Sequence, residues 1–136
     1  MNIKKTNQIK ASPQIRIPRD LYTELLFRDF TGTQSFLLMH IARYQFGFNK
    51  LKCCLCNRTE LCYTGLDKSA VSKGIKFLVD SCVLLEGEES FEINTQIDKW
   101  LIPIKSTADR SRFESIETYH ILKQAELINN QQKNDL

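Results

Sequence analysis

The feature that most constrains this chain is a turn followed by an amphipathic, lysine-rich segment. The turn Thr64-Gly65-Leu66 leads into Asp67, a residue suited to cap a helix, so a helix is predicted over Asp67–Asp80. Four of its residues recur at the i, i+3, i+4, i+7 spacing of a buried stripe: Val71, Gly74, Ile75 and Leu78. The outward positions hold small hydroxyls and cations: Ser69, Ser72, Lys73 and Lys76. One face of this helix is therefore predicted to lie in a core and the other to face solvent or a partner.

Short elements are predicted on both sides of this helix. Asn57 with Glu60 three residues later is typical of a capping box, which favours a short helix through Leu61 and Cys62. After the helix, the apolar runs 83–85 and 91–93 are predicted to pair as strands about the turn Glu86-Gly87-Glu88-Glu89. The order short helix, turn, helix, hairpin is that of a winged helix-turn-helix, whose second helix lies in the major groove of DNA.

The rest of the chain adds further helices and one apolar strand. Pro18 favours a helix start, and Thr31 or Thr33 is suited to cap the next helix. Helices are predicted over 19–30, from the cap to about 44, and over 110–128, and a strand over 51–56. The fold class is therefore α+β, a mostly helical winged helix-turn-helix with a small antiparallel β-wing and a trailing C-terminal helix.

The predicted organisation is one domain with extensions. Trp100, Leu101 and Ile102 are expected to pack back on the domain before Pro103 ends it. The apolar residues of the last helix need a partner surface, which is either the domain itself or a second copy of the chain in a homodimer. The expected boundaries are a flexible basic arm over 1–14, a winged-helix DNA-binding domain over 15–103, a linker over 104–109, a possible dimerisation helix over 110–128 and a polar tail over 129–136.

The charge distribution favours nucleic acid as a partner. Residues 1–60 carry ten Lys and Arg against four Asp and Glu, whereas residues 61–136 carry nine against twelve. The amino-terminal part is thus suited to phosphate contacts, which supply the sequence-independent share of affinity for nucleic acids. Five lysines and arginines near the amino terminus are candidates for an arm in an adjacent groove: Lys4, Lys5, Lys10, Arg16 and Arg19.

Six residues are predicted to contact double-stranded DNA. Ser69, Ser72 and Lys73 are assigned to base edges in the major groove, because hydroxyls and cations there hydrogen-bond to bases. Arg58, Lys68 and Lys76 are assigned to backbone phosphates. Arg58 lies near the start of the first helix of this motif, which crosses the sugar-phosphate strand.

No cofactor, metal site or catalytic activity is predicted. The sequence has five cysteines and no recognisable export signal, so the cysteines are expected to be reduced thiols. Cys53 and Cys56 have the spacing of a zinc-binding pair, but no second pair follows at zinc-finger spacing. No glycine-rich phosphate loop or recognisable nucleophile context is present in the sequence. No apolar run approaches the roughly 20 residues that span a bilayer, so a cytoplasmic protein without a membrane partner is expected.

The stretch 15–94 resembles the amino-terminal domain of the phage replication protein O family, the origin-binding initiators of phage replication. The resemblance lies in Ile15-Arg16-Ile17-Pro18, in Phe46-Gly47-Phe48-Asn49-Lys50, in the block from Thr64 to Ile75, and in Leu78-Val79 with the 83–85 strand. It implies binding to repeated origin sequences as a dimer and recruitment of host replication proteins through a region that follows the domain.

Two departures limit what this resemblance transfers. Full-length family members have a substantial carboxy-terminal helicase-recruiting region, whereas the 42 residues after Asn94 suffice for a single helix. Helicase recruitment is therefore not carried over. The predicted wing tip Glu86-Gly87-Glu88-Glu89 is also acidic and would repel phosphates if it lay along the groove.

Three functions fit these features. The leading one is a phage or mobile-element replication initiator that recognises an origin. Most of its predicted DNA contacts come from the helix Asp67–Asp80. The first alternative is a transcriptional regulator that uses the same fold on a promoter. The second is a winged-helix module that binds a protein through its acidic wing and trailing helix and does not bind DNA.

Overall fold

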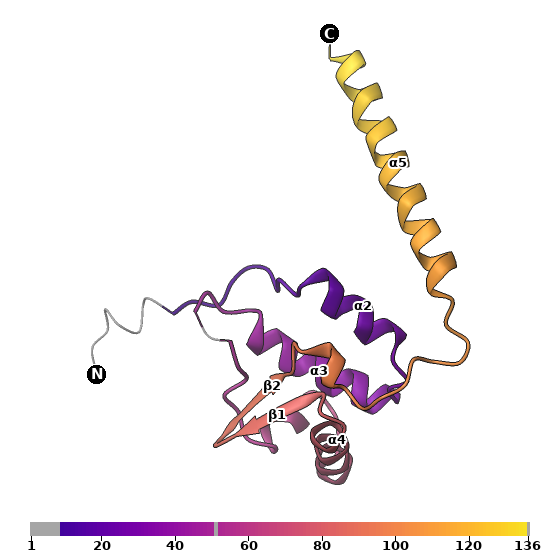
Figure 1. Ribbon diagram of the computed structural model, residues 1–136. Coiled ribbons are helices and arrows are strands. Elements are labelled where there is room, and N and C mark those ends of the chain that lie inside the picture. The colour runs from indigo at the N-terminus through magenta and orange to yellow at the C-terminus, as the bar shows by residue number, and fades with distance from the viewer. Residues whose placement is uncertain (1–8, 51, 136) are drawn as a thin grey trace. The chain divides into compact units, whose positions relative to one another are not determined.

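The computed structural model describes residues 9–50 and 52–135 of the protein (Figure 1). Contacts between residues divide the chain into two compact units, Met1–Lys105 and Ser106–Leu136. In the described parts, the first unit contains α2 (Arg19–Phe27), α3 (Gly32–Gln45), η1 (Glu60–Cys62), α4 (Lys68–Asp80), β1 (Leu84–Gly87), β2 (Ser90–Ile93) and η2 (Ile97–Lys99), and the second contains α5 (Arg110–Asn134). The fold class is α+β, as predicted.

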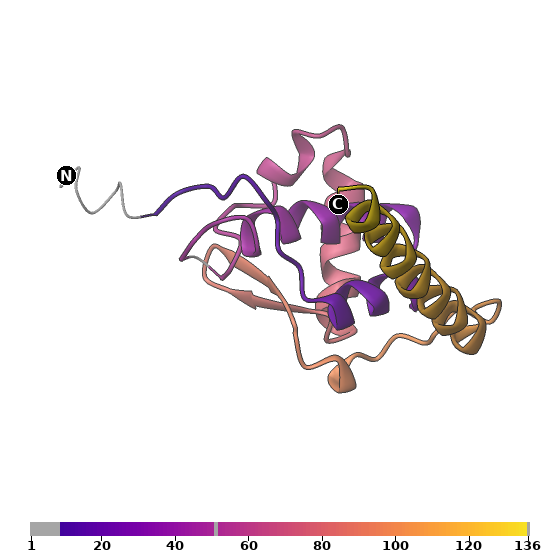
Figure 2. The same ribbon diagram turned by 90° about the horizontal axis from the view of Figure 1, so that it is seen from above.

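Helix α3 is the centre of the first unit, between α2 and α4 in the view of Figure 1. Its side chains Leu37, Leu38 and Ile41 are fully buried, which explains why the sequence shows an apolar set too wide for a surface helix. Residues of α3 contact both α4 and β2, and Figure 2 shows α4 crossing α3. The core therefore forms between α3, α4 and the small sheet.

A capping box fixes the start of α3. The Thr31 hydroxyl accepts a hydrogen bond from the Gln34 amide at 3.2 Å, and the Gln34 side chain accepts one from the Thr31 amide at 2.9 Å. Of the two threonines that the sequence offers as caps, Thr31 is the one that caps. Both bonds satisfy amides that the helix itself leaves without partners.

Replacing Thr31 with alanine is expected to lower the free energy of unfolding by about 1 kcal/mol, the usual contribution of a helix cap. The measurement is urea denaturation followed by circular dichroism. Thr33→Ala is the matched control, because Thr33 lies in the first turn of α3 and does not cap it. Equal losses from the two substitutions would show that the cap does not stabilise α3.

Helix α2 ends earlier than predicted. Pro18 precedes it with φ −54° and ψ 137°, as expected, but α2 stops at Phe27 instead of Phe30. The next residue, Arg28, has an extended backbone with φ −78° and ψ 152° and forms an antiparallel bridge with Ile104. Pairing with a segment 76 residues further along the chain thus replaces the last turn of the predicted helix.

The helix-turn-helix is present, with a very short first helix. The Asn57 amide donates to the Glu60 carboxylate at 3.1 Å and the Glu60 amide donates to the Asn57 side chain at 2.9 Å, as the predicted capping box requires. Only the three-residue 3-10 helix η1 follows. Gly65 then takes φ 109°, a conformation that favours glycine, and the Asp67 side chain caps α4 by accepting from the Ala70 amide at 2.8 Å.

The hairpin begins directly after α4. The Val83 amide donates to the Leu78 carbonyl and the Cys82 amide to the Val79 carbonyl, which closes the helix as a Schellman motif with Cys82 at φ 62°. Strands β1 and β2 are antiparallel, with Leu84 opposite Ile93 and Gly87 opposite Ser90. This sheet follows α4 as a winged helix requires.

The predicted strand 51–56 is wrong as a regular strand. Leu51 lies outside the described residues, and in 52–56 only Cys54 pairs, in a single bridge to Phe91. The Cys54 amide donates to the Phe91 carbonyl at 2.7 Å and the Phe91 amide to the Cys54 carbonyl at 2.9 Å. Because the chain enters the Asn57 capping box three residues later, it has no room for a longer ladder.

A buried glutamine joins α3 to the sheet. Gln45 is 2% exposed, and its side chain donates to the Ile93 carbonyl at 3.1 Å and accepts from the Ile93 amide. The two hydrogen bonds give partners to the buried amide and carbonyl of Ile93 in β2. The end of α3 and the second strand of the hairpin are therefore fixed relative to each other.

The described part of the expected flexible arm is held in place. The Ser12 amide donates to the Gly47 carbonyl at 2.6 Å and the Asn49 amide to the Lys10 carbonyl at 3.1 Å. The Asn49 side chain also accepts from the Lys10 amide at 2.9 Å. Residues 10–12 thus pair with residues 47–49, which follow α3, whereas Lys4 and Lys5 lie outside the described residues.

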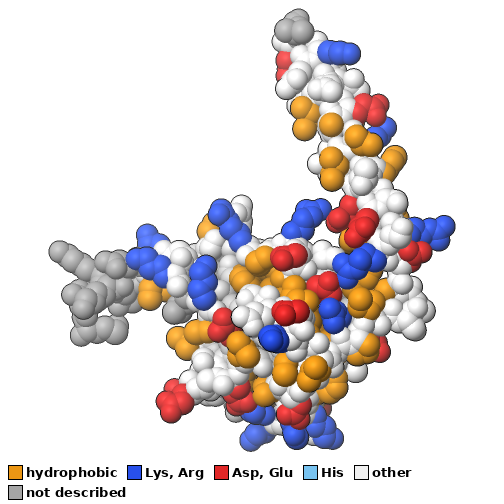
Figure 3. Space-filling view, viewed as in Figure 1, with side chains coloured by type: hydrophobic (Ala, Val, Ile, Leu, Met, Phe, Trp, Pro, Cys, Tyr) orange, Lys and Arg blue, Asp and Glu red, His pale blue; other side chains and the backbone are white. Residues whose placement is uncertain are grey.

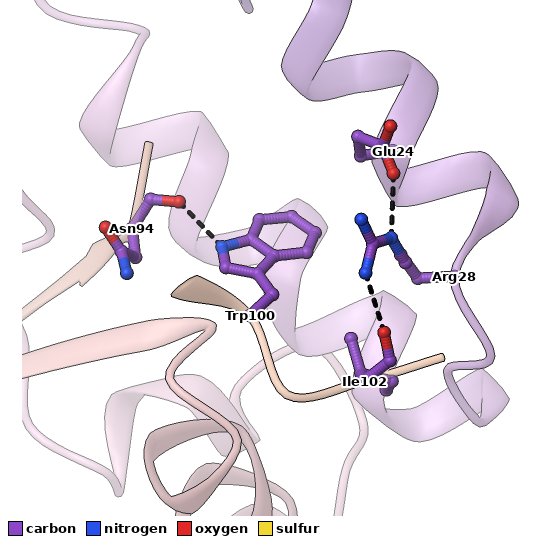
Figure 4. A network of polar contacts seen from close by, with 5 residues as sticks. All are labelled: Glu24, Arg28, Asn94, Trp100 and Ile102. Atoms are coloured by element: carbon purple, nitrogen blue, oxygen red, sulfur yellow. Dashed lines mark hydrogen bonds and ion pairs between the residues drawn. The ribbon is translucent and has the colours of Figure 1, made fainter. Parts of the chain in front are cut away.

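The segment after the hairpin packs back on the domain through Trp100 (Figure 4). The indole N–H donates to the Asn94 carbonyl at 2.8 Å, and the ring lies edge-on to Phe30 with centroids 6.0 Å apart. Arg28 donates to Glu24 and to the Ile102 carbonyl, both at 2.7 Å, with its guanidinium 5.9 Å from the Trp100 ring. Leu101, predicted to pack here as well, is 71% exposed because the extended backbone alternates its side chains.

Helix α5 is longer than predicted. It runs to Asn134, six residues beyond the expected end at Ile128, and so includes most of the expected polar tail. Gln and Lys are good helix formers, so polarity alone does not end a helix. No residue of α5 is buried, and six of its large apolar side chains are exposed: Ile116, Tyr119, Ile121, Leu122, Leu127 and Ile128. No helix in the described residues is long and apolar enough to cross a membrane.

Candidate nucleic-acid interface

The outer face of α4 is the candidate interface. Its inner face is buried through Val71, Gly74, Ile75 and Leu78, the four residues that the sequence stripe predicts. A Cβ at Gly74 would lie 2.5 Å from a Leu37 methyl, so α3 and α4 cross closely at this glycine. On the outer face, Lys68, Ser69, Lys73 and Lys76 are exposed and Ser72 is half-buried. The hydroxyls and cations that the sequence singles out are therefore brought to one side.

Two of the lysines on this face have no acidic partner among the described residues. Lys68 and Lys73 form no ion pair with any residue in the described ranges 9–50 and 52–135. Lys76 is paired with Asp80 one turn later at 2.9 Å, with side chains 76% and 62% exposed. Such an exposed pair contributes about 0.3–0.5 kcal/mol and exchanges readily for another anion. Lys68 and Lys73 are the cations most open to a phosphate or a base.

Arg58 lies in a different environment from the one that the sequence suggests. Its guanidinium contacts the carboxylate of Glu86 on β1, with Nη2–Oε distances of 3.3 and 3.5 Å. The two side chains are 40% and 39% exposed. The residue assigned to a phosphate is thus paired with the hairpin of its own domain.

A hollow of about 220 Å³ joins the first turn of α3 to α4. It is lined by Thr31, Thr33, Gln34, Ala70, Lys73 and Gly74. Thr33 and Gln34 therefore lie beside Lys73, although 39 residues separate Gln34 from Lys73 in the sequence. Sequence reasoning missed these two polar residues because it treated the start of α3 only as a cap.

The hairpin tip is acidic. Glu88 and Glu89 form the turn between β1 and β2, with Glu89 at φ 54°. Both line a second hollow together with Glu60 of η1. Figure 3 shows acidic side chains at the lower left, where the hairpin ends, and mostly basic ones along the lower edge, over α4. The α4 face and the hairpin tip therefore differ in charge.

The comparisons with known proteins identify a family. The model of bacteriophage replication protein O matches residues 14–100, more than half of the chain. The chain belongs to the bacteriophage replication protein O family. The comparison with curated proteins and the comparison with solved structures each gave no match. The resemblance in the sequence is thereby confirmed, and it relates the chain to phage replication.

The match to the phage replication protein O model covers the candidate interface and the elements that pack against α4. It begins just before the Ile15–Pro18 segment and ends at Trp100, so it includes α3, the helix-turn-helix, the hairpin and the indole that packs against Phe30. Helix α5 lies outside the match. The family assignment therefore concerns the first unit.

The cysteines of this phage replication protein are not arranged as in a zinc knuckle. The close pair is Cys54 and Cys56, with Sγ atoms 3.0 Å apart, and not Cys53 and Cys56. Burial raises the pKa of both thiols, most strongly that of Cys54, and so keeps them protonated. In the described residues, no group of three or more His, Cys, Asp or Glu side chains is placed to hold a metal ion.

Proposed function

We propose that this protein binds double-stranded DNA sequence-specifically and recognises a replication origin of a phage or mobile element. The observation that carries the proposal is the outer face of α4, where Lys68 and Lys73 are exposed without acidic partners in the described residues. The membership in a phage replication family supports the same conclusion. A charged and hydroxylated helix face of this kind suits the major groove.

In the proposed mechanism, α4 lies in the major groove. Ser69, Ser72 and Lys73 hydrogen-bond to base edges, which supplies the sequence preference. Lys68 holds a backbone phosphate, and Lys76 and Arg58 do so after leaving Asp80 and Glu86. The proposal gives the protein no catalytic step and no cofactor, and it places the protein in the cytoplasm of the host cell.

The test is selection of bound duplexes from a random pool, followed by mapping of the winning sequence onto the source genome. A winning site inside the replication genes supports origin recognition. A site at promoters alone would assign the same DNA-binding surface to a transcriptional regulator. Failure to enrich any sequence, with no measurable affinity for duplex DNA at physiological salt, would contradict the proposal.

The acidic hairpin favours a second candidate, a winged helix that binds a protein. Glu86, Glu88 and Glu89 are exposed on one hairpin and would repel a duplex that lay along it. This candidate predicts no enrichment in the selection experiment. It also predicts that the partner carries a basic surface.

We further propose that the protein is a homodimer through α5. The supporting observation is that six large apolar side chains of this helix are exposed, Ile121 at 65% and Leu122 at 66% among them. Association of two copies would remove this apolar surface from water. Two protein molecules per complex are also suited to the repeated sites that the family resemblance implies.

Sedimentation of the protein is expected to show a dimer, and Ile121→Glu is expected to shift it to the monomer. The physical reason is that a carboxylate cannot enter an apolar interface without losing its hydration. Gln124→Glu is the control, because it adds the same charge to α5 without removing an apolar side chain. A wild-type protein that stays monomeric at high concentration would contradict dimerisation through α5.

A further inference from the structure

The contact between Arg58 and Glu86 joins two parts of the DNA-facing motif. Arg58 precedes η1, the first helix of the helix-turn-helix, and Glu86 lies in β1 of the hairpin. Their closest N–O distance is 3.3 Å, and both side chains remain about 40% exposed. The pair is thus formed at the surface, where a competing anion has access to the guanidinium.

The surroundings of this pair keep the guanidinium in a negative potential. Glu86 is followed within three residues by Glu88 and Glu89, and these two lie beside Glu60 around the second hollow. In the protein without DNA, nearby carboxylates therefore compensate the positive charge of Arg58. On α4, Lys68 and Lys73 have no carboxylate paired with them in the part of the chain that the structure describes.

We propose that Glu86 competes with DNA phosphates for Arg58 and so lowers the affinity of the protein for DNA. This inference rests on the proposed DNA binding. Non-specific affinity comes from the counterions that phosphates release when cations of the protein replace them. A phosphate that displaces Glu86 forms an ion pair with Arg58, but the carboxylate of Glu86 loses its partner and must then be neutralised by a cation from solution. Arg58 therefore contributes little to binding of a random duplex.

A selected duplex differs because α4 makes base contacts there. These contacts hold one backbone phosphate at a fixed position near Arg58, so the new ion pair forms without further loss of orientational freedom. An exposed ion pair is weak enough to exchange under these conditions. Glu86 thus lowers the affinity for the selected duplex by the free energy of the ion pair that has to be broken, and it lowers the affinity for a random duplex by no more than that amount.

The test compares Glu86→Gln with Glu88→Gln in the full chain. Both substitutions remove one negative charge from the hairpin, but no contact between Arg58 and Glu88 is present in the described residues. Dissociation constants are measured on a selected and on a random duplex over a range of salt concentrations. Circular dichroism and thermal unfolding verify that each variant keeps the wild-type fold.

Glu86→Gln is expected to raise affinity for the selected duplex about threefold beyond Glu88→Gln, the size typical of an exposed ion pair, and affinity for the random duplex by no more than that. The slope of log affinity against log salt becomes steeper by about 0.9, because Arg58 then contributes one phosphate contact. The steeper slope is expected on the random duplex, where Arg58 of the wild-type protein contributes little. In the Arg58→Gln background, Glu86→Gln is expected to have no effect beyond that of Glu88→Gln.

Two outcomes overturn the inference and are distinguishable from failure of the proposed function. Equal effects of Glu86→Gln and Glu88→Gln would reduce the role of Glu86 to general charge repulsion. An unchanged benefit of Glu86→Gln without Arg58 would show that the guanidinium is not the group that is released. In both cases the wild-type protein still selects a duplex, whereas a wild-type protein that binds no duplex would remove the DNA-binding proposal itself.

Discussion

Replacing Trp100 with alanine is expected to lower the free energy of unfolding of the first unit by about 3–5 kcal/mol, the range for large aromatic deletions in a core. Trp100 is 5% exposed and belongs to the hydrophobic core. The substitution removes the edge-on contact with Phe30 and the hydrogen bond to the Asn94 carbonyl. It also leaves the guanidinium of Arg28 without the ring beside it.

Trp100→Phe is the control for this prediction. It keeps an aromatic ring but removes the indole N–H, which leaves the Asn94 carbonyl without this donor at a cost of about 1–3 kcal/mol. Since Trp100 is the single tryptophan of the chain, unfolding in urea is followed by circular dichroism and not by fluorescence. A loss below that of Trp100→Phe would show that the segment after β2 does not belong to the folded unit.

The parts of the fold that were predictable depend on local signals. Asp67 as a cap, Gly65 in the turn and a stripe at helical spacing together define α4 within one residue, because each acts within a few positions. The capping box at Asn57 is equally local, and so is the choice of a threonine cap for α3, although the sequence left Thr31 and Thr33 as alternatives. The α+β class and the hairpin follow from the same kind of pattern.

The parts that were not predictable depend on distant segments. Arg28 leaves the helix because Ile104 pairs with it, and Cys54 pairs only with Phe91, and neither pairing has a trace in the local sequence. The same holds for the interface. Glu86 compensates Arg58 across 28 residues, and the hollow brings Thr33 and Gln34 beside Lys73. The local sequence shows which lysines and arginines lie on one face of a helix, but it does not show which acidic side chains the fold brings next to them.

Replacing Lys73 with alanine is expected to weaken binding to the selected duplex about tenfold to hundredfold, the cost of losing a contact to a base edge. Affinity for a random duplex falls much less, so the sequence preference relaxes. Lys73 is suited to this role because it is exposed on α4, has no acidic partner in the described residues and borders the hollow with Thr33 and Gln34. Dissociation constants on the selected duplex, on single-base variants of it and on a random duplex measure the effect.

Lys68→Ala is the matched control, because Lys68 is also exposed and unpaired among the described residues but is assigned to a phosphate. It is expected to weaken all duplexes alike and to make the salt dependence shallower by about one unit. Lys76→Ala should change the salt dependence less, since Asp80 already compensates the charge of Lys76. If Lys73→Ala and Lys68→Ala lowered the affinity for selected and random duplexes by the same factor, Lys73 would hold a phosphate and the sequence preference would arise from other residues of α4.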